Sequence, residues 1–95
     1  MRIHESIERF VAWLERRVKE ERGAVFSVKA GRVAEEAGIP LPHAARILHH
    51  LYRAGVVEKF NRNTYIFSRY TTTEVIIKGV KEWLKEKAKA EAKAA

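Results

Sequence analysis

The spacing of apolar residues changes abruptly at Gly55, from a helical to an extended pattern. Before this glycine, apolar side chains recur with helical periodicity, which predicts a helix over residues 41–54 with Pro42 in its first turn. After it, β-branched and aromatic residues flank the turn sequence Asn61-Arg62-Asn63, which predicts a hairpin over residues 56–68. A helix followed directly by a two-stranded hairpin therefore organises the middle of the chain.

The flanking segments predict further helices and one more strand. Residues 3–22 form an amphipathic pattern, and the β-prone run 24–27 must pair with another strand because it is too short to stand alone. Ser27 is the expected N-cap of a helix over residues 28–37. Hydroxyls of residues 71–73 can cap a C-terminal helix over residues 73–90, followed by a frayed tail over residues 91–95 that has no large apolar side chain to bury.

These elements predict a single domain over residues 1–95 that is mainly α with a small antiparallel sheet, an α+β fold. Its expected order is helix, strand, helix, helix, strand, strand, helix. All twelve acidic residues are Glu, and the chain has no Asp, no Gln, no Cys and a single Met. Because this composition avoids thermolabile side chains, it predicts a thermophilic source.

The available residues argue against catalysis and metal binding. Without cysteine there is no disulfide, thiolate nucleophile or cysteine-ligated zinc, and the chain has no glycine-rich phosphate loop or serine nucleophile motif. His49 and His50 point about 100° apart on a helix and His43 lies two turns from His50, so one ion could not bind all three. We expect no catalytic residue, metal, cofactor or small-molecule ligand. No apolar run approaches a membrane span or a signal peptide, which predicts a cytoplasmic protein.

Three stretches carry a family resemblance: Val33–Ile39, Ala44–Leu48 and Leu51–Glu58. With them the chain resembles the winged helix-turn-helix family common among archaeal and bacterial transcription regulators. The family shares the small residue and glycine that end the second helix, the leucine spacing of the third, and the Leu-x-x-Ala-Gly-Val-Val passage into the wing. The resemblance covers residues 28–68 and implies a recognition helix over residues 41–54, with the hairpin as a short wing.

One arc of the predicted recognition helix suits contact with nucleic acid. It lies opposite the apolar arc of Ala44, Ile47, Leu48 and Leu51, and it holds no large aliphatic side chain. Small residues allow close approach to a groove, and arginine can pair with guanine. The members of this arc are Pro42, His43, Ala45, Arg46, His49, His50 and Arg53. In the family the first half of the helix meets base edges, so the resemblance implies base contacts by His43, Ala45 and Arg46, with His49, His50 and Arg53 nearer the phosphates.

The charge of the chain favours a polyanionic partner. The formal net charge is +7, and the sequence pI is about 10.0. Residues 24–70 carry seven basic and three acidic side chains, a net of +4, so over half of the excess lies in the helix-turn-helix and the wing. Lys59 and Arg62 extend the predicted site into the hairpin, where Arg62 occupies the tip and suits a phosphate or minor-groove contact. Protonation of the histidines would add positive charge to this face in mild acid.

The C-terminal helix has more apolar surface than one packing face needs. Ile76, Val80, Trp83 and Leu84 form one stripe, and Val75 and Ile77 lie on either side of it. Terminal helices of winged proteins often pair across a twofold axis. We therefore expect a homodimer through Val75, Ile77, Val80, Trp83 and Leu84. The alternative is that the first helix covers the whole apolar surface, with Trp13 at the edge of its own stripe.

The leading function is binding of double-stranded DNA, either as a transcription regulator or as a nucleoid-associated, chromatin-type architectural protein. Arg46 on the predicted base-facing arc favours a regulator, whereas the lack of Asn and Gln there favours weak specificity. A second hypothesis is an RNA-binding or ribosome-associated protein, because one small-subunit ribosomal protein of archaea and eukaryotes is similar in size, basicity and winged fold. A third is a winged helix that contacts only proteins of the transcription or replication machinery, which predicts an apolar recognition face.

Overall fold

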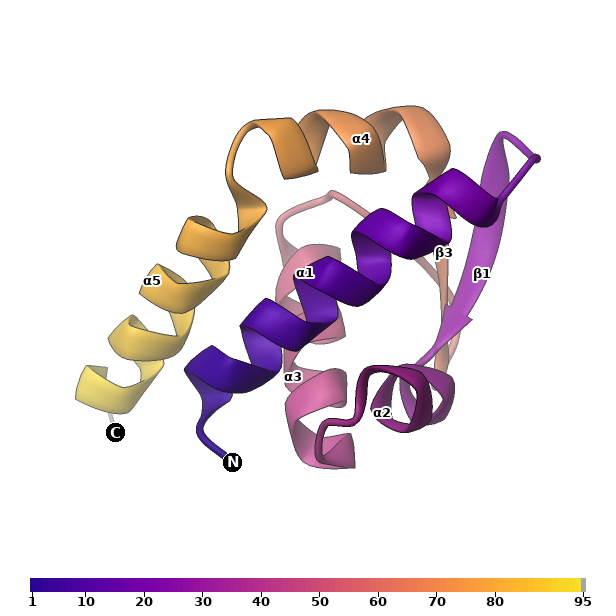
Figure 1. Ribbon diagram of the computed structural model, residues 1–95. Coiled ribbons are helices and arrows are strands. Elements are labelled where there is room, and N and C mark those ends of the chain that lie inside the picture. The colour runs from indigo at the N-terminus through magenta and orange to yellow at the C-terminus, as the bar shows by residue number, and fades with distance from the viewer. Residues whose placement is uncertain (95) are drawn as a thin grey trace.

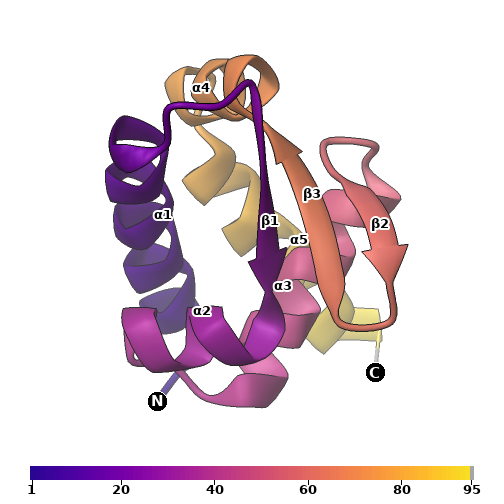
Figure 2. The same ribbon diagram turned by 90° about the vertical axis from the view of Figure 1, so that its right-hand side faces the viewer.

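Three strands form one antiparallel sheet in a computed structural model of the chain. The strands are β1 (Val25–Lys29), β2 (Glu58–Asn61) and β3 (Thr64–Ser68), and β3 lies between the other two. Figure 2 shows them side by side, with β1 and β2 as the two edges. The structure describes the backbone of residues 1–94 and the side chains of residues 1–76 and 78–91. Strand β1 pairs with β3, which confirms the prediction that the first strand pairs with a later one.

The helices cover one face of the sheet and both of its ends (Figures 1 and 2). The predicted α+β class is confirmed. The order of the elements is close to the expected one, and it differs only in that the predicted last helix is divided into two. The helices are α1 (Ile3–Glu20), α2 (Ala30–Ala37), α3 (Leu41–Arg53), α4 (Arg69–Ile77) and α5 (Val80–Ala94). None of the helices in the described part of the chain is long and apolar enough to pass through a bilayer.

A single apolar core lies between the sheet and the helices. Helix α1 crosses its centre and packs against the other four helices, and Phe10 of this helix has no exposed surface. From the sheet, Phe26 and Phe67 point inward and stack with their ring centroids 5.5 Å apart. Because α1 contacts so many elements, it fixes the positions of α3 and α5 relative to each other.

The second helix begins later than predicted, and Ser27 is not its N-cap. Strand β1 continues through Val28 and Lys29, which pair with Tyr65 and Thr64 of β3. Val28 is only 2% exposed, so strand geometry buries it well. Lys29 takes the N-cap position without a side-chain hydrogen bond. Sheet pairing therefore outweighs the capping preference of serine.

The predicted helix 73–90 is two helices, because Gly79 interrupts it with a left-handed φ of 87°. Helix α4 begins earlier than expected, at Arg69, and its N-cap is Ser68, whose Oγ accepts a hydrogen bond from the Thr71 amide at 3.5 Å. Helix α5 turns away from α4 and runs beside α1 (Figure 1). Helix α5 continues to Ala94, and the fraying expected for residues 91–95 stays a prediction.

Candidate nucleic-acid interface

Helix α3 is held in place by its apolar side and by the glycines that precede and follow it. Gly38 ends α2 with a φ of 67°, and the Arg9 guanidinium donates a hydrogen bond to its carbonyl at 3.1 Å. At the other end Gly55 has a φ of 78°, and the Val56 amide reaches back to the Leu51 carbonyl at 3.0 Å. This is the glycine-terminated helix end known as a Schellman motif. Both ends of α3 are therefore fixed by backbone geometry.

The apolar arc of α3 faces the core as the sequence indicates. Ala44, Ile47, Leu48 and Leu51 are each at most 1% exposed. The opposite side of the helix is open to solvent. The predicted site residues that are exposed there include no large aliphatic side chain. The exposed members of the predicted set on this helix are Pro42, Ala45, Arg46, His49 and Arg53.

His43 does not lie on this open face. Its Nδ1 is 2.6 Å from the Oγ of Ser6 on α1, and Ser6 is completely buried. His43 is half-buried because it stands at the edge of the apolar arc, where α1 packs against α3. Nδ1 of His43, for which a base contact is expected, therefore makes a hydrogen bond between two helices. A helical wheel of α3 alone does not reveal this hydrogen bond, because Ser6 lies on α1, which is distant from α3 in the sequence.

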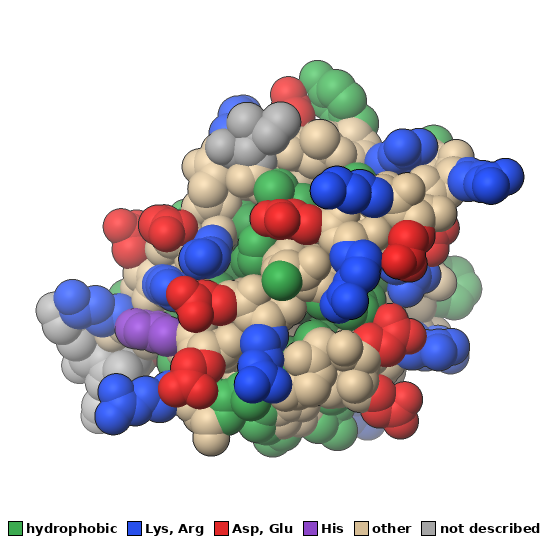
Figure 3. Space-filling view, viewed as in Figure 1, with side chains coloured by type: hydrophobic (Ala, Val, Ile, Leu, Met, Phe, Trp, Pro, Cys, Tyr) green, Lys and Arg blue, Asp and Glu red, His purple; other side chains and the backbone are tan. Residues whose placement is uncertain are grey.

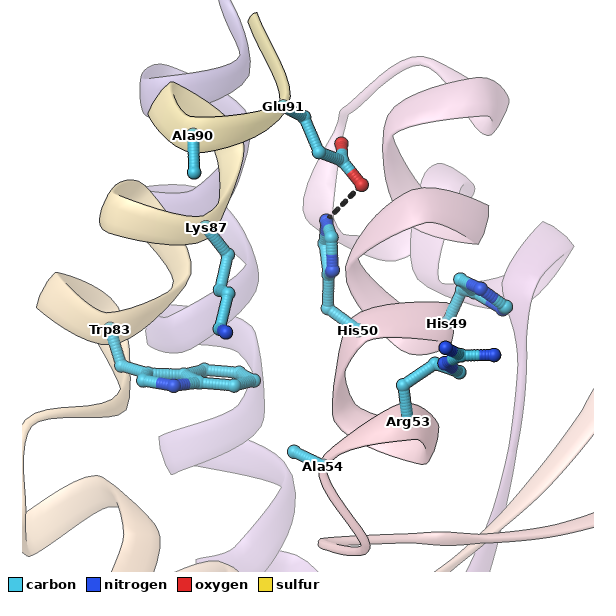
Figure 4. Close-up of a pocket in the computed structure, with 8 residues that line it drawn as sticks. All are labelled: His49, His50, Arg53, Ala54, Trp83, Lys87, Ala90 and Glu91. Atoms are coloured by element: carbon cyan, nitrogen blue, oxygen red, sulfur yellow. Dashed lines mark ion pairs between the residues drawn. The ribbon is translucent and has the colours of Figure 1, made fainter. Parts of the chain in front are cut away.

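Helix α5 reaches the other side of the predicted site through Glu91. The Oε2 of Glu91 lies 3.1 Å from Nε of Arg46, and its Oε1 lies 3.1 Å from Nε2 of His50. His50 is half-buried as a result, whereas its neighbour His49 is exposed. Figure 4 shows Glu91 and His50 facing each other, with the pair drawn as a dashed line.

A groove separates α3 from α5 below this contact. It has a volume of about 720 Å³ and is bounded by Arg53 and Ala54 on one side and by Trp83 and Lys87 on the other. In Figure 4 the Trp83 indole extends across from α5 toward α3. The Lys87 Nζ lies 5.8 Å from the centre of that ring, in a cation–π contact. The groove is therefore lined by one basic residue from each helix and has one carboxylate at its end.

The hairpin places Lys59 beside α3. Lys59 Nζ lies 5.6 Å from the ring centre of Tyr52 on α3 and 5.8 Å from that of Tyr65 on β3. Arg62 is exposed in the turn between β2 and β3. The register of β2 shifts between Lys59 and Asn61, and Phe60 at that bulge is 74% exposed. The two predicted hairpin residues are thus accessible, Lys59 beside α3 and Arg62 in the turn.

Tyr52 is a surface residue that the sequence interpretation missed. It is 41% exposed and lies between the open face of α3 and the hairpin. On the helical wheel it falls between the apolar and the polar arcs, next to Leu41. That intermediate position, together with its amphipathic ring, is the signal that could have included it.

The predicted dimer surface is largely part of the core. Val80 is 3% exposed and Leu84 is 1% exposed, and both pack in the core that α1 crosses. Their expected role in dimerisation is therefore corrected to intramolecular packing. Val75 and Trp83 are half-buried and retain some accessible surface. The side chain of Ile77 lies outside the described residues.

Charge is distributed unequally over the surface. On the face that Figure 3 displays, where α1 and α5 lie in front, acidic and basic side chains alternate. Glu8 on that face accepts a hydrogen bond from Lys85 Nζ at 3.1 Å, with Lys81 nearby at 3.8 Å. These lysines lower the pKa of Glu8, through the Lys85 hydrogen bond first and the charges second. The basic side chains of this face are therefore balanced locally.

The segment that forms the candidate site has less local balance. From residue 41 to residue 63 the basic side chains are Arg46, Arg53, Lys59 and Arg62, and Glu58 is the only acidic one. Glu91 of α5 adds one carboxylate from outside the segment. Within residues 1–94, no cluster of three or more His, Cys, Asp or Glu side chains has the spacing of a metal site. Comparison with known proteins gave no match to a family model, to a curated protein or to a solved structure.

Proposed function

We propose that this protein binds double-stranded DNA, with α3 in the major groove and the β2–β3 hairpin against the adjacent backbone. The observation that carries the proposal is the open face of α3. It combines exposed Arg46, His49 and Arg53 with the small side chain of Ala45, opposite a fully buried apolar arc. An α-helix of this kind fits the width of the major groove. The resemblance of residues 28–68 to winged helix-turn-helix proteins points to the same mode of docking.

The proposed roles follow the position of each side chain. Ala45 allows the helix to approach the bases closely, and Arg53 and His49 are placed to contact phosphates or base edges. Lys59 and Arg62 supply phosphate contacts from the hairpin. We assign His43 no contact with the DNA, because it is half-buried and its Nδ1 is already held by Ser6.

Weak sequence specificity is part of the proposal. The open face has no Asn or Gln, the side chains that recognise adenine by paired hydrogen bonds. Arg46, the residue best suited to guanine, is engaged by Glu91. The arrangement therefore favours a DNA-coating or architectural role over a regulator of single sites.

A salt titration of binding tests the proposal. Three cations that are free of Glu91, Arg53 on α3 and Lys59 and Arg62 on the hairpin, predict a slope of log K against log salt of about −2.7, which is roughly a 40-fold loss of affinity between about 50 and 200 mM salt. Random duplex, candidate promoter DNA and structured RNA serve as three arms. We expect random and promoter duplexes to bind similarly and more tightly than the RNA. Binding that is independent of salt would contradict the proposal, and a clear preference for the RNA would favour the RNA-binding hypothesis.

A further inference from the structure

The side chain of Glu91 occupies the place of an anionic ligand. Its two oxygens contact two different cationic or potentially cationic groups of α3, each at 3.1 Å. Carboxylate and phosphate present similar oxygens to a guanidinium, so a site that holds one suits the other. The pair of Arg46 and His50 therefore forms an anion-binding site that this protein fills with its own carboxylate.

The occupant fits the His50 side of this site imperfectly. Nε2 of His50 is buried, and although Glu91 lies at ion-pair distance, the two are not aligned for a hydrogen bond. The His50 side chain is 13% exposed, whereas that of Glu91 is 42% exposed. A buried ring nitrogen without an aligned partner leaves hydrogen-bonding capacity unused. A phosphate group, which has more oxygens and a larger radius, could use that capacity.

The groove continues from this site between two further cations. Arg53 and Lys87 line it from α3 and α5, and its volume of about 720 Å³ leaves room for a sugar-phosphate segment. Arg53 shares the open face of α3 with Arg46, so a backbone that follows the helix would meet both. The groove is thus continuous with the proposed DNA-binding face.

Release of Glu91 requires only a small movement. Ala88 is the last buried residue of α5 in the described part of the chain, at 5% exposure, and Lys89, Ala90 and Glu91 are exposed. The end of the helix can therefore move away from α3 while Val80 and Leu84 stay in the core. The pair between Arg46 and Glu91 is exposed on both sides, and exposed ion pairs are weak, which makes exchange feasible.

We propose that Arg46 and His50 bind a backbone phosphate of the nucleic acid, and that Glu91 competes with it as an intramolecular substitute. This inference rests on the proposed function. Its consequence is that the free protein is partly self-inhibited, since binding must first displace Glu91. Removing the carboxylate should therefore tighten binding beyond what the loss of one negative charge explains.

Glu91→Gln and Glu86→Gln provide a matched test. Both remove one carboxylate from α5, and Glu86 is exposed and forms no ion pair among the residues that the structure describes. We expect Glu91→Gln to bind random duplex about 3- to 10-fold more tightly than the wild type at roughly 100 mM salt, because the carboxylate no longer competes for Arg46 and His50. Glu86→Gln should change affinity less than 2-fold. Equal effects of the two substitutions would overturn the proposal.

A second measurement separates this inference from the proposed function. Titration with inorganic phosphate, followed by NMR of the histidine rings, should shift the signals of His50 more in Glu91→Gln than in the wild type, with exposed His49 as the internal reference. Arg46→Ala in the Glu91→Gln background should abolish that difference. If no variant binds duplex but the His50 signals respond in this way, the anion site stands and the DNA proposal fails. If duplex binds but the His50 signals respond equally to phosphate in the wild type and in Glu91→Gln, only the anion site is refuted and the DNA proposal stands.

Discussion

The hydrogen bond between Ser6 and His43 should stabilise the fold without contributing to nucleic-acid binding. Ser6 is fully buried, and its Oγ is 2.6 Å from Nδ1 of His43. Ser6→Ala removes this hydrogen bond and leaves the ring nitrogen without its partner. Such losses cost about 1–3 kcal/mol. Because His43 is only half-buried, water can reach part of the ring, and we expect the lower end of that range.

Thermal and urea unfolding measure the cost. In a domain of this size, each kcal/mol lowers Tm by roughly 4–8 °C. His43→Ala should destabilise the protein by a similar amount, and the double variant should lose less than the sum of the two single losses, with a coupling of about 0.5 kcal/mol or more. Duplex affinity measured below the unfolding transition should change less than 2-fold in Ser6→Ala and His43→Ala.

The opposite pattern would refute this reasoning. If His43→Ala lowered duplex affinity 10-fold or more and left the unfolding free energy unchanged, His43 would be a DNA contact and the link to Ser6 incidental. Additive losses of stability would show that the two side chains do not depend on each other.

Three further predictions concern the fold. Gly79→Ala should destabilise the protein by about 1 kcal/mol or more, because Gly79 has a φ of 87°. Gly31→Ala should stabilise it by about 0.4–1 kcal/mol, because Gly31 lies within helix α2 and has open space around it. Urea unfolding that gave both substitutions the same sign would contradict this prediction. Because the pKa of Glu8 is lowered in the folded state, its contribution to stability is present above its unfolded pKa and disappears as pH falls through its folded pKa. Glu8→Gln should therefore flatten the loss of unfolding free energy in acid, while Glu5→Gln, which has no ion pair in the described part of the chain, serves as the control. Light scattering should give a monomer of 11.0 kDa, since Val80 and Leu84 are already buried, and a mass of twice that value would require a different dimer surface.

The sequence predicts the elements that depend on local pattern. The apolar arc of α3 and the glycine at its end lie within single turns of the chain, so periodicity and conformational preference are sufficient to place them. The sheet pairing of the first short strand follows from its length alone. Because local pattern places the helix and the hairpin, the positions of Arg53, Lys59 and Arg62 on these elements were sufficient to assign them to the candidate site.

The differences arise where distant segments meet. The stripe of Ile76, Val80 and Leu84 continues helical spacing across Gly79, so the break between α4 and α5 is not visible in the apolar pattern. Likewise a wheel of α3 shows which residues are polar, but not that Ser6 and Glu91 approach from α1 and α5. These partners are separated from α3 by many residues, and their positions depend on how the whole core packs.

The central claim is that the open face of α3 holds duplex DNA by its own cations. Its most direct test compares Arg53→Ala with Arg16→Ala in salt-titrated binding to random duplex. The two variants have the same net charge, but Arg53 lies on α3 and Arg16 is exposed on α1. We predict that Arg53→Ala weakens binding and reduces the steepness of the salt slope by about 0.9, as the loss of one phosphate contact requires, whereas Arg16→Ala leaves the slope unchanged. Equal slopes for the two variants would contradict the claim that α3 forms the interface.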